Sequence, residues 1–276
     1  DMIYVILATV LCLQNVQGVP SMEPVQTDPL QFSVTHDGSA GESLDGRVYI
    51  MLTRRKVPPI GGPNWWNPEP FFAVDVEDWS AGTPLLINDD ADKMDTPLSE
   101  IGEGPWKAVA VYRGENERSL LTVPGGLYSE VKAINGNSAN AGTLHMPLSN
   151  NVPDRNWNTH KNLRLIETKS PMLSEFYGRD INHGACVIVP DNYDPLREEP
   201  YPVMFWIGEF GIDHYGARMI KAYFTASDFD DQICRVVLNA QTHSGHHVFA
   251  DSANNGPRMT ALITEFIPFL EEKYNL

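Results

Sequence analysis

The chain has 276 residues, and its 20 lysines and arginines against 36 aspartates and glutamates give a formal net charge of −16. Its hydrophobic content of 42% is typical of a globular protein, and its length suffices for one large domain or two ordinary ones. Nucleic-acid affinity depends on clustered Lys and Arg, and the longest basic run here is Arg54-Arg55-Lys56. We therefore expect no nucleic-acid partner.

The amino-terminal segment has the pattern of a secretory signal peptide. From Met2 to Leu13 every residue except Thr9 is apolar, and Val16 and Gly18 place small residues at positions −3 and −1 of a cleavage site. A transmembrane helix needs about 20 apolar residues, more than this stretch offers. We expect residues 1–18 to be a signal peptide, the protein to be secreted or periplasmic, and no stable membrane anchor to be present.

Residues 28–135 have the pattern of an all-β domain. Short strand-like runs alternate with clusters of Gly, Pro, Asn and Asp, as in an immunoglobulin-like sandwich. The expected strands are Leu30–Thr35, Gly46–Thr53, Phe71–Val76, Pro84–Ile87, Trp106–Tyr112 and Gly126–Ala133. Residues 136–162 are rich in Asn, Gly and Ser at their start and have little periodicity, which predicts a linker.

Residues 163–276 have a different pattern, with apolar runs typical of strands buried on both faces. The segment between the last two expected strands leaves room for one helix, at about residues 217–227, and apolar residues recur at helical spacing from Pro257 to Tyr274, where Pro268 predicts a kink. The expected strands are Leu163–Glu167, His183–Pro190, Tyr201–Ile207 and Cys234–Ala240. This order predicts the first half of a doubly wound α/β sheet. Cys186 and Cys234 lie inside two of these strands, so we expect both thiols to be buried and unreactive.

Several segments of this half resemble the putative esterases of the α/β-hydrolase superfamily, the group near esterase D and enterochelin esterase. The segments that carry the resemblance are Val189–Tyr193, Tyr201–Val203, Phe210–Arg218, Ala250–Pro257 and Glu265–Glu271. The resemblance implies ester hydrolysis by a Ser-His-Asp triad, without a cofactor, on a small-molecule or polysaccharide-linked ester. It also implies an α/β-hydrolase domain behind a sandwich-type amino-terminal domain.

The nucleophile of that family stands in a Gly-x-Ser-x-Gly elbow, and no such pattern occurs in the 276 residues. The nearest, Thr242-His243-Ser244-Gly245, lacks the leading glycine. The triad Asp and His follow the Ser in this superfamily, so we expect a chain truncated before its catalytic residues and inactive alone. The resemblance assigns one oxyanion amide to the loop with Glu209, Phe210 and Gly211, although Glu209 and Ile212 stand where relatives usually have glycines.

A second loop, Gln241–Gly256, follows the last expected strand and carries His243, Asp251, Asn254 and Asn255 as candidates for the substrate pocket. Asx side chains in such a loop also cap helices, and both roles stay open. His243, His246 and His247 with Asp251 offer a weaker pattern for a zinc site, which would make the protein a metal-dependent hydrolase. We expect no metal. His183 and His214 are interpreted as structural.

The leading hypothesis is therefore part of an exported serine esterase. Its rival is a non-catalytic secreted binding protein that engages carbohydrate or another ligand through Trp65 and Trp66.

Overall fold

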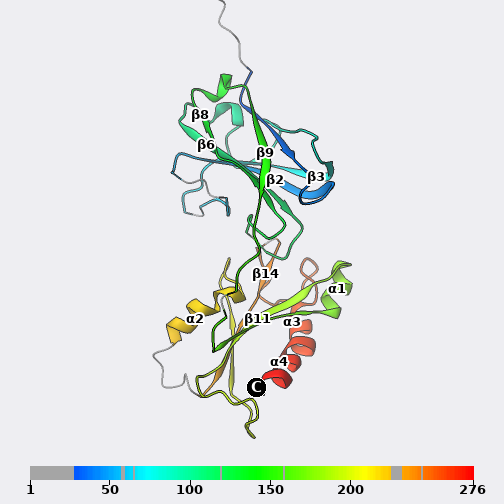
Figure 1. The fold of residues 1–276 in the computed structure, drawn as a ribbon. Coiled ribbons are helices and arrows are strands. Elements are labelled where there is room, and N and C mark those ends of the chain that lie inside the picture. The colour runs from blue at the N-terminus through cyan, green and yellow to red at the C-terminus, as the bar shows by residue number, and fades with distance from the viewer. Residues whose placement is uncertain are drawn as a thin grey trace, which may run out of the picture.

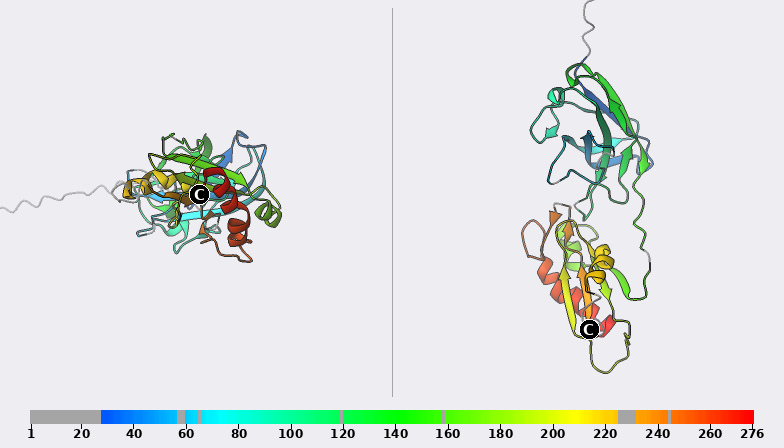
Figure 2. Two further views of the ribbon diagram at one scale, coloured as in Figure 1. Left: turned by 90° about the horizontal axis from the view of Figure 1, so that it is seen from below. Right: turned by 90° about the vertical axis from the view of Figure 1, so that its left-hand side faces the viewer.

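The computed structural model describes residues 28–276 apart from 57–59, 65, 119, 158, 225–231 and 244. The expected signal peptide and Trp65 lie outside the described residues. The protein is mostly β, in two units stacked end to end (Figures 1 and 2). The first unit contains strands β1 to β9 and the second contains β10 to β15 with the helices α1 to α4. Within the described part of the chain, no helix is long and apolar enough to cross a membrane.

The first unit is one curled, mixed sheet. Its strands follow the order β4-β1-β9-β7-β6-β2-β3-β5, with β8 pairing β6. The β1–β9 pair is parallel and the other pairs are antiparallel. The bounds are Gln31–His36 (β1), Ser43–Thr53 (β2), Phe71–Ser80 (β3), Leu85–Ile87 (β4), Asp92–Lys93 (β5), Trp106–Gly114 (β6), Leu127–Ser129 (β7), Lys132–Ile134 (β8) and Thr143–Asn151 (β9), with 3-10 turns at Leu98–Glu100 and Ser138–Asn140.

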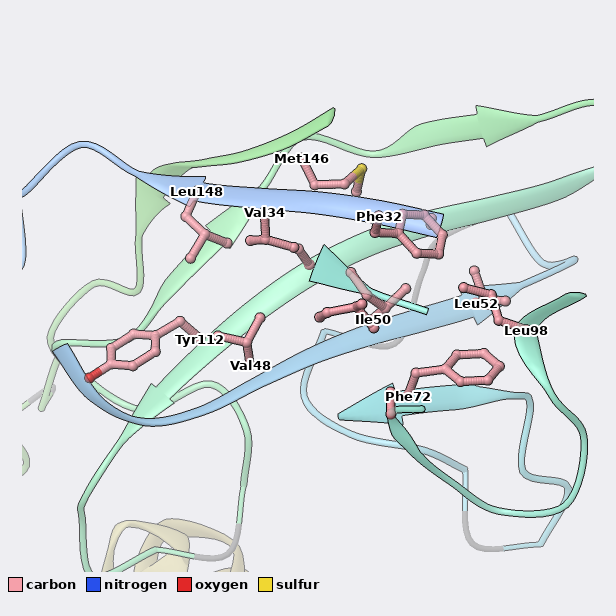
Figure 3. Close-up of a cluster of buried hydrophobic side chains, with 14 of the residues drawn as sticks. Phe32, Val34, Val48, Ile50, Leu52, Phe72, Leu98, Tyr112, Met146 and Leu148 are labelled. Atoms are coloured by element: carbon pink, nitrogen blue, oxygen red, sulfur yellow. The ribbon is translucent and has the colours of Figure 1, made fainter. Parts of the chain in front are cut away.

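The core of this unit lies inside the curl. Alternate residues of β2, namely Val48, Ile50 and Leu52, enter one cluster with Phe32 of β1 and Leu148 of β9 (Figure 3). The intervening Met51 belongs to a second cluster on the opposite face, where Leu121 covers it. Strands far apart in the sheet order thus share a core because the sheet bends over it.

Strand β9 corrects the sequence analysis. The segment 136–162, expected to be a linker, contains Thr143–Asn151, which pairs with β1 on one side and β7 on the other. The strand was not predicted because its alternation of apolar and polar residues is short. Its fully buried residues are Met146 and Leu148. The expected strand 126–133 is in fact the two strands β7 and β8.

The second unit has a four-stranded sheet with helices on both faces (Figure 1). Its order is β10-β11-β13-β12, in which β12 and β13 are parallel and the other two pairs are antiparallel. Its strands are Leu163–Lys169 (β10), Asn182–Ile188 (β11), Val203–Ile207 (β12) and Cys234–Leu238 (β13), and Gln241–Thr242 (β14) and Gly245–His246 (β15) form a small separate hairpin. β11 and β13 are buried as expected, whereas β12 is half-exposed because it lies at the edge of the sheet.

The helices pack on opposite faces of this sheet. α2 (Ala217–Phe224), which follows a 3-10 turn at His214–Gly216, buries Ala217 and Ile220 against one face. The carboxyl-terminal helices cover the other face through residues such as Phe266 and Leu270. They are α3 (Arg258–Ala261), a π-helical turn (Leu262–Phe266) and α4 (Ile267–Tyr274), and α1 (Pro171–Tyr177) lies beside α3. The π turn directly precedes Pro268, whose missing N–H disrupts regular α-helical bonding at the expected kink.

Candidate functional site

The candidate site lies at one edge of the second sheet, the edge that faces the first unit (Figure 1). The parallel strands β12 and β13 end here, at Ile207 and Leu238. In open α/β sheets, ligands bind in the crevice outside the carboxyl ends of the strands. The end of β10 and the start of β11 lie at the same edge, because Glu167 pairs with Gly184.

The structure brings together the loops that follow β12 and β13. The Nδ1 atom of His246 accepts the Val248 N–H at 3.1 Å, so Nε2 carries the proton and donates to the carbonyl of Gly208 at 2.9 Å. The amide nitrogen of Gln241 donates to the carbonyl of Ile212 at 3.2 Å. These two bonds join segments that are about 30 residues apart in the chain into one surface.

The Glu209, Phe210 and Gly211 candidates form an exposed turn at this surface. The Glu209 carbonyl accepts the Ile212 N–H at 2.9 Å, and Gly211 has a φ of 82°, which favours glycine. The N–H groups of Glu209 and Gly211 donate to no residue that the structure describes, so both are available to a ligand. The ring of Phe210 packs on Gly245, where an added Cβ would lie 2.8 Å from it.

His243 lies at the boundary with the first unit. Its carbonyl accepts a hydrogen bond of 3.1 Å from Arg113 at the end of β6, and its exposed side chain lines a pocket of about 350 Å³ between the units. Tyr177 and Arg179 of the second unit line the same pocket. His243 thus lines a ligand-sized pocket and belongs to the turn of the β14–β15 hairpin, whose His246 contacts Gly208.

The Asp251 candidate caps a helix. Its carboxylate accepts the N–H groups of Met259 and Thr260 at 2.7 and 3.1 Å and the Thr260 hydroxyl at 2.6 Å. These bonds, the Thr260 hydroxyl first, hold the pKa of Asp251 below its ordinary value. Asn254 and Asn255 lie in a turn beside α1, since a Cβ on Gly256 would be 2.8 Å from the ring of Phe176. Capping therefore accounts for Asp251 at the start of α3.

The histidines of the second loop do not form a metal site with their neighbours. His247 is buried, and the loss of hydration lowers its pKa to about 3. Its Nδ1 atom accepts the Phe249 N–H at 3.0 Å. Across the part of the chain that the structure describes, no three His, Cys, Asp or Glu side chains are placed to hold a metal ion.

A Ser-Glu-His group elsewhere in the second unit contains the residue types of a catalytic triad, but its hydrogen bonds are not those of a triad. Ser170 Oγ and His183 Nε2 both contact the same oxygen of Glu265, at 2.5 and 3.1 Å. Ser170 also accepts the Leu173 N–H and so caps α1. A nucleophilic serine needs its hydrogen bond to the histidine, so this group is suited to holding α1 against the π turn.

Sequence reasoning missed the residues that join the two units. Glu117, in the connection between β6 and β7, accepts hydrogen bonds from Arg179 at 2.6 Å and from Arg258 at 2.8 Å. Arg155 forms an ion pair with Asp213 and lies over the ring of Tyr215, 3.9 Å from its centre. The partners are 58 to 141 residues apart, and no local pattern connects them.

No family model and no curated protein matches the sequence. Nineteen chains of solved structures match the fold. One of them, described as "Crystal Structure of a Thermostable Esterase", is 10% identical, and the match covers 89% of this chain and 67% of that chain. The TM-score of 0.30 indicates a weak likeness to the fold of an esterase, and it carries no information about substrate or activity.

Proposed function

We propose that this chain supplies the front half of the active site of a secreted serine esterase that hydrolyses an acyl ester. The observation that supports this is the contact between the loops after β12 and β13, made by His246 and Gly208 at the carboxyl edge of parallel strands. These are the two loops to which the sequence resemblance assigns the oxyanion donor and the substrate pocket.

The chemistry that these loops offer is electrostatic. The N–H groups of Glu209 and Gly211 have no described partner, and such backbone donors stabilise the negative charge that develops on a carbonyl oxygen during acyl transfer. The Glu209 side chain is exposed, which lets its charge be solvated away from that oxygen. His243, which lines the pocket between the units, is the residue that we propose to contact the substrate.

The proposal includes a finer fold assignment. The second unit is the beginning of an α/β-hydrolase domain, and the first unit is an immunoglobulin-like sandwich that precedes it. Because no Gly-x-Ser-x-Gly occurs in the 276 residues, the nucleophile is proposed to come from sequence after Leu276. The 276-residue chain is then inactive alone.

The experiment compares two proteins from the same gene, the 276-residue chain and the product of its reading frame extended past Leu276. Both are assayed with p-nitrophenyl acetate, a small activated ester. Hydrolysis by the extended protein alone supports the proposal. Hydrolysis by the 276-residue chain, or an extended protein that contains no serine elbow, contradicts it.

A second candidate function is carbohydrate binding by the first unit. Trp66 is 96% exposed, and Asn64 holds its turn by accepting the Trp66 N–H at 2.9 Å. An exposed indole is a surface on which a sugar ring stacks. Retention on an insoluble polysaccharide that Trp66→Ala abolishes would favour this function.

A further inference from the structure

A second pocket, of about 250 Å³, lies between the two units and is distinct from the one at His243. The connection between β6 and β7 forms one wall and includes Arg118, Val123 and Pro124. The opposite wall is the edge of the second sheet, with Glu167 of β10 and Asn239 after β13. We call it the inter-unit pocket.

Gly184 lies in the second wall, between Glu167 and Asn239. Glu167 pairs with Gly184 across β10 and β11, and the Asn239 N–H donates to the Gly184 carbonyl at 2.8 Å, so the three residues lie side by side. A Cβ on Gly184 would lie 2.8 Å from Cε1 of His214 and 3.1 Å from Cβ of Asn239. A side chain at position 184 would therefore collide with the His214 ring, and glycine is the residue that fits at this point of the wall.

Some polar groups around the pocket are already engaged and build its walls. Both oxygens of Glu117 accept arginine hydrogen bonds. The Asn116 side chain donates to the Gly114 carbonyl and accepts the Arg118 N–H, both at 2.8 Å. Asp180 forms an ion pair with Lys169 at 2.5 Å. These groups have little capacity left for a ligand.

Four other side chains retain open hydrogen-bonding groups. One oxygen of Glu167 lies 3.3 Å from His214, and the other bonds to no residue that the structure describes. The Arg118 guanidinium lies 5.4 Å from the centre of the Tyr215 ring and has no hydrogen-bond partner in the described part of the chain. The side-chain amide of Asn182 and the side-chain amide nitrogen of Asn239 also have no hydrogen-bond partner in the described part of the chain. The side-chain oxygen of Asn239 accepts the Gln241 N–H.

The four side chains with open groups carry one negative charge and one positive charge. The His214 imidazole, 3.3 Å from one carboxylate oxygen, and the nearby Arg118 hold the pKa of Glu167 below its ordinary value, so its carboxylate stays negative at neutral pH. Arg118 supplies one positive charge. One carboxylate acceptor among guanidinium and amide donors matches hydroxyl groups, which both donate and accept, better than it matches an anion. Val123, Pro124 and Gly184 add apolar surface for C–H groups.

We propose that the inter-unit pocket binds a neutral, polyhydroxylated ligand, one sugar unit of a glycoside. Glu167 accepts hydroxyl hydrogens, and Arg118, Asn182 and Asn239 donate to ligand oxygens. The site needs no ester chemistry and none of the residues of the proposed oxyanion loop. It is also separate from Trp66, so its test is independent of both functions proposed above.

The test uses the 276-residue chain, with saturation-transfer NMR of methyl glucoside, methyl galactoside and methyl xyloside, and with the phosphorus-31 line width of inorganic phosphate as a charged probe. We expect at least one glycoside to bind and phosphate to compete poorly. Glu167→Gln and Asn182→Ala should each weaken glycoside binding about tenfold, the effect of losing one good hydrogen bond. Asn182 is exposed and holds no described partner, so its alanine variant tests binding without disturbing the fold.

The matched control is Glu175→Gln on α1, an exposed carboxylate away from the pocket, which should leave affinity unchanged. The proposal is overturned if no glycoside binds, if phosphate alone binds, or if neither pocket variant changes glycoside affinity. Loss of binding in Trp66→Ala would also overturn it, because the sugar would then occupy the first unit. Hydrolysis of p-nitrophenyl acetate does not enter this test, so the proposed esterase function can fail without affecting it.

Discussion

Arg258 donates to Glu117 across 2.8 Å, a contact between residues 141 positions apart that ties the start of α3 to the β6–β7 connection. Arg258 is only 4% exposed, and its second partner is the Tyr177 hydroxyl at 3.1 Å. The other Glu117 oxygen accepts from Arg179 at 2.6 Å. One carboxylate thus pairs with two guanidinium groups where the units meet.

Removing this charge should destabilise the protein. Glu117→Gln leaves the buried Arg258 without an anionic partner, and we expect the free energy of unfolding to fall by about 2–3 kcal/mol. Urea denaturation measures it. Glu115→Gln is the matched control, since Glu115 is highly exposed and lies 3.5 Å from Arg179, and such surface pairs contribute little. If the two substitutions lower the free energy of unfolding equally, the burial of Arg258 does not determine the loss of stability.

The buried imidazole of His247 predicts acid sensitivity. Its pKa is lowered from 6.5 to about 3 by burial, with Arg258 contributing. Above pH 6.5, His247 is neutral in both the folded and the unfolded chain. Below pH 6.5, the imidazole takes up a proton in the unfolded chain but not in the folded protein. The free energy of unfolding therefore falls on acidification by up to about 1.4 kcal/mol per pH unit, until the pKa of the folded state is reached. Burial lowers the pKa of His183 as well, which adds to the same trend.

Free energies of unfolding measured between pH 7 and 4 test whether stability falls on acidification. His247→Asn, which offers an oxygen to the Phe249 N–H in place of Nδ1, should flatten the pH dependence, whereas His145→Asn at an exposed position of β9 should not. An unchanged slope in the His247 variant would refute this account.

The two described thiols should be unreactive in the folded protein. Cys186 and Cys234 are free and fully buried, and burial raises the pKa of each to about 12, so the nucleophilic thiolate is scarce. Iodoacetamide followed by peptide mass spectrometry should label neither residue in native buffer and both in denaturant. Labelling of Cys186 or Cys234 under native conditions would mean that the strands open locally.

Gly184 should tolerate no side chain. Gly184→Ala places a methyl group 2.8 Å from the buried His214 ring, so we expect a loss of about 1–3 kcal/mol of stability. Gly61→Ala is the control, because its Cβ would meet the Thr122 hydroxyl at an ordinary 3.7 Å. Thermal unfolding compares the two, and equal melting temperatures would show that His214 moves aside without cost.

The sequence predicted the elements whose pattern is local. β2 and β6 are long, apolar and bounded by turn residues, and their expected bounds differ from the observed ones by three residues at most. The expected helix near 217–227 begins at Ala217, as predicted. Strand β9 was missed because its role depends on partners 112 residues away in β1 and nearer ones in β7, and few of its own side chains are buried.

The same distinction holds for the candidate site. The sequence analysis directed attention to the loops after β12 and β13, and the structure joins them through His246 and Gly208 at the edge where the parallel strands end. The capping role of Asp251 was one of two open interpretations, and only the coordinates show its bonds to Thr260. The contacts of Glu117 and the close approach of His214 to Gly184 were beyond sequence reasoning, because both bring together residues that are far apart in the chain.

The most direct test of the central claim is to map the site of fluorophosphonate attachment on the product of the reading frame extended past Leu276. This reagent reacts with the activated serine of a serine hydrolase. The account predicts one labelled serine, located after Leu276 within a Gly-x-Ser-x-Gly elbow, and no label on the 276-residue chain. Label on a serine within the 276 residues, or none on a folded extended protein, would contradict it.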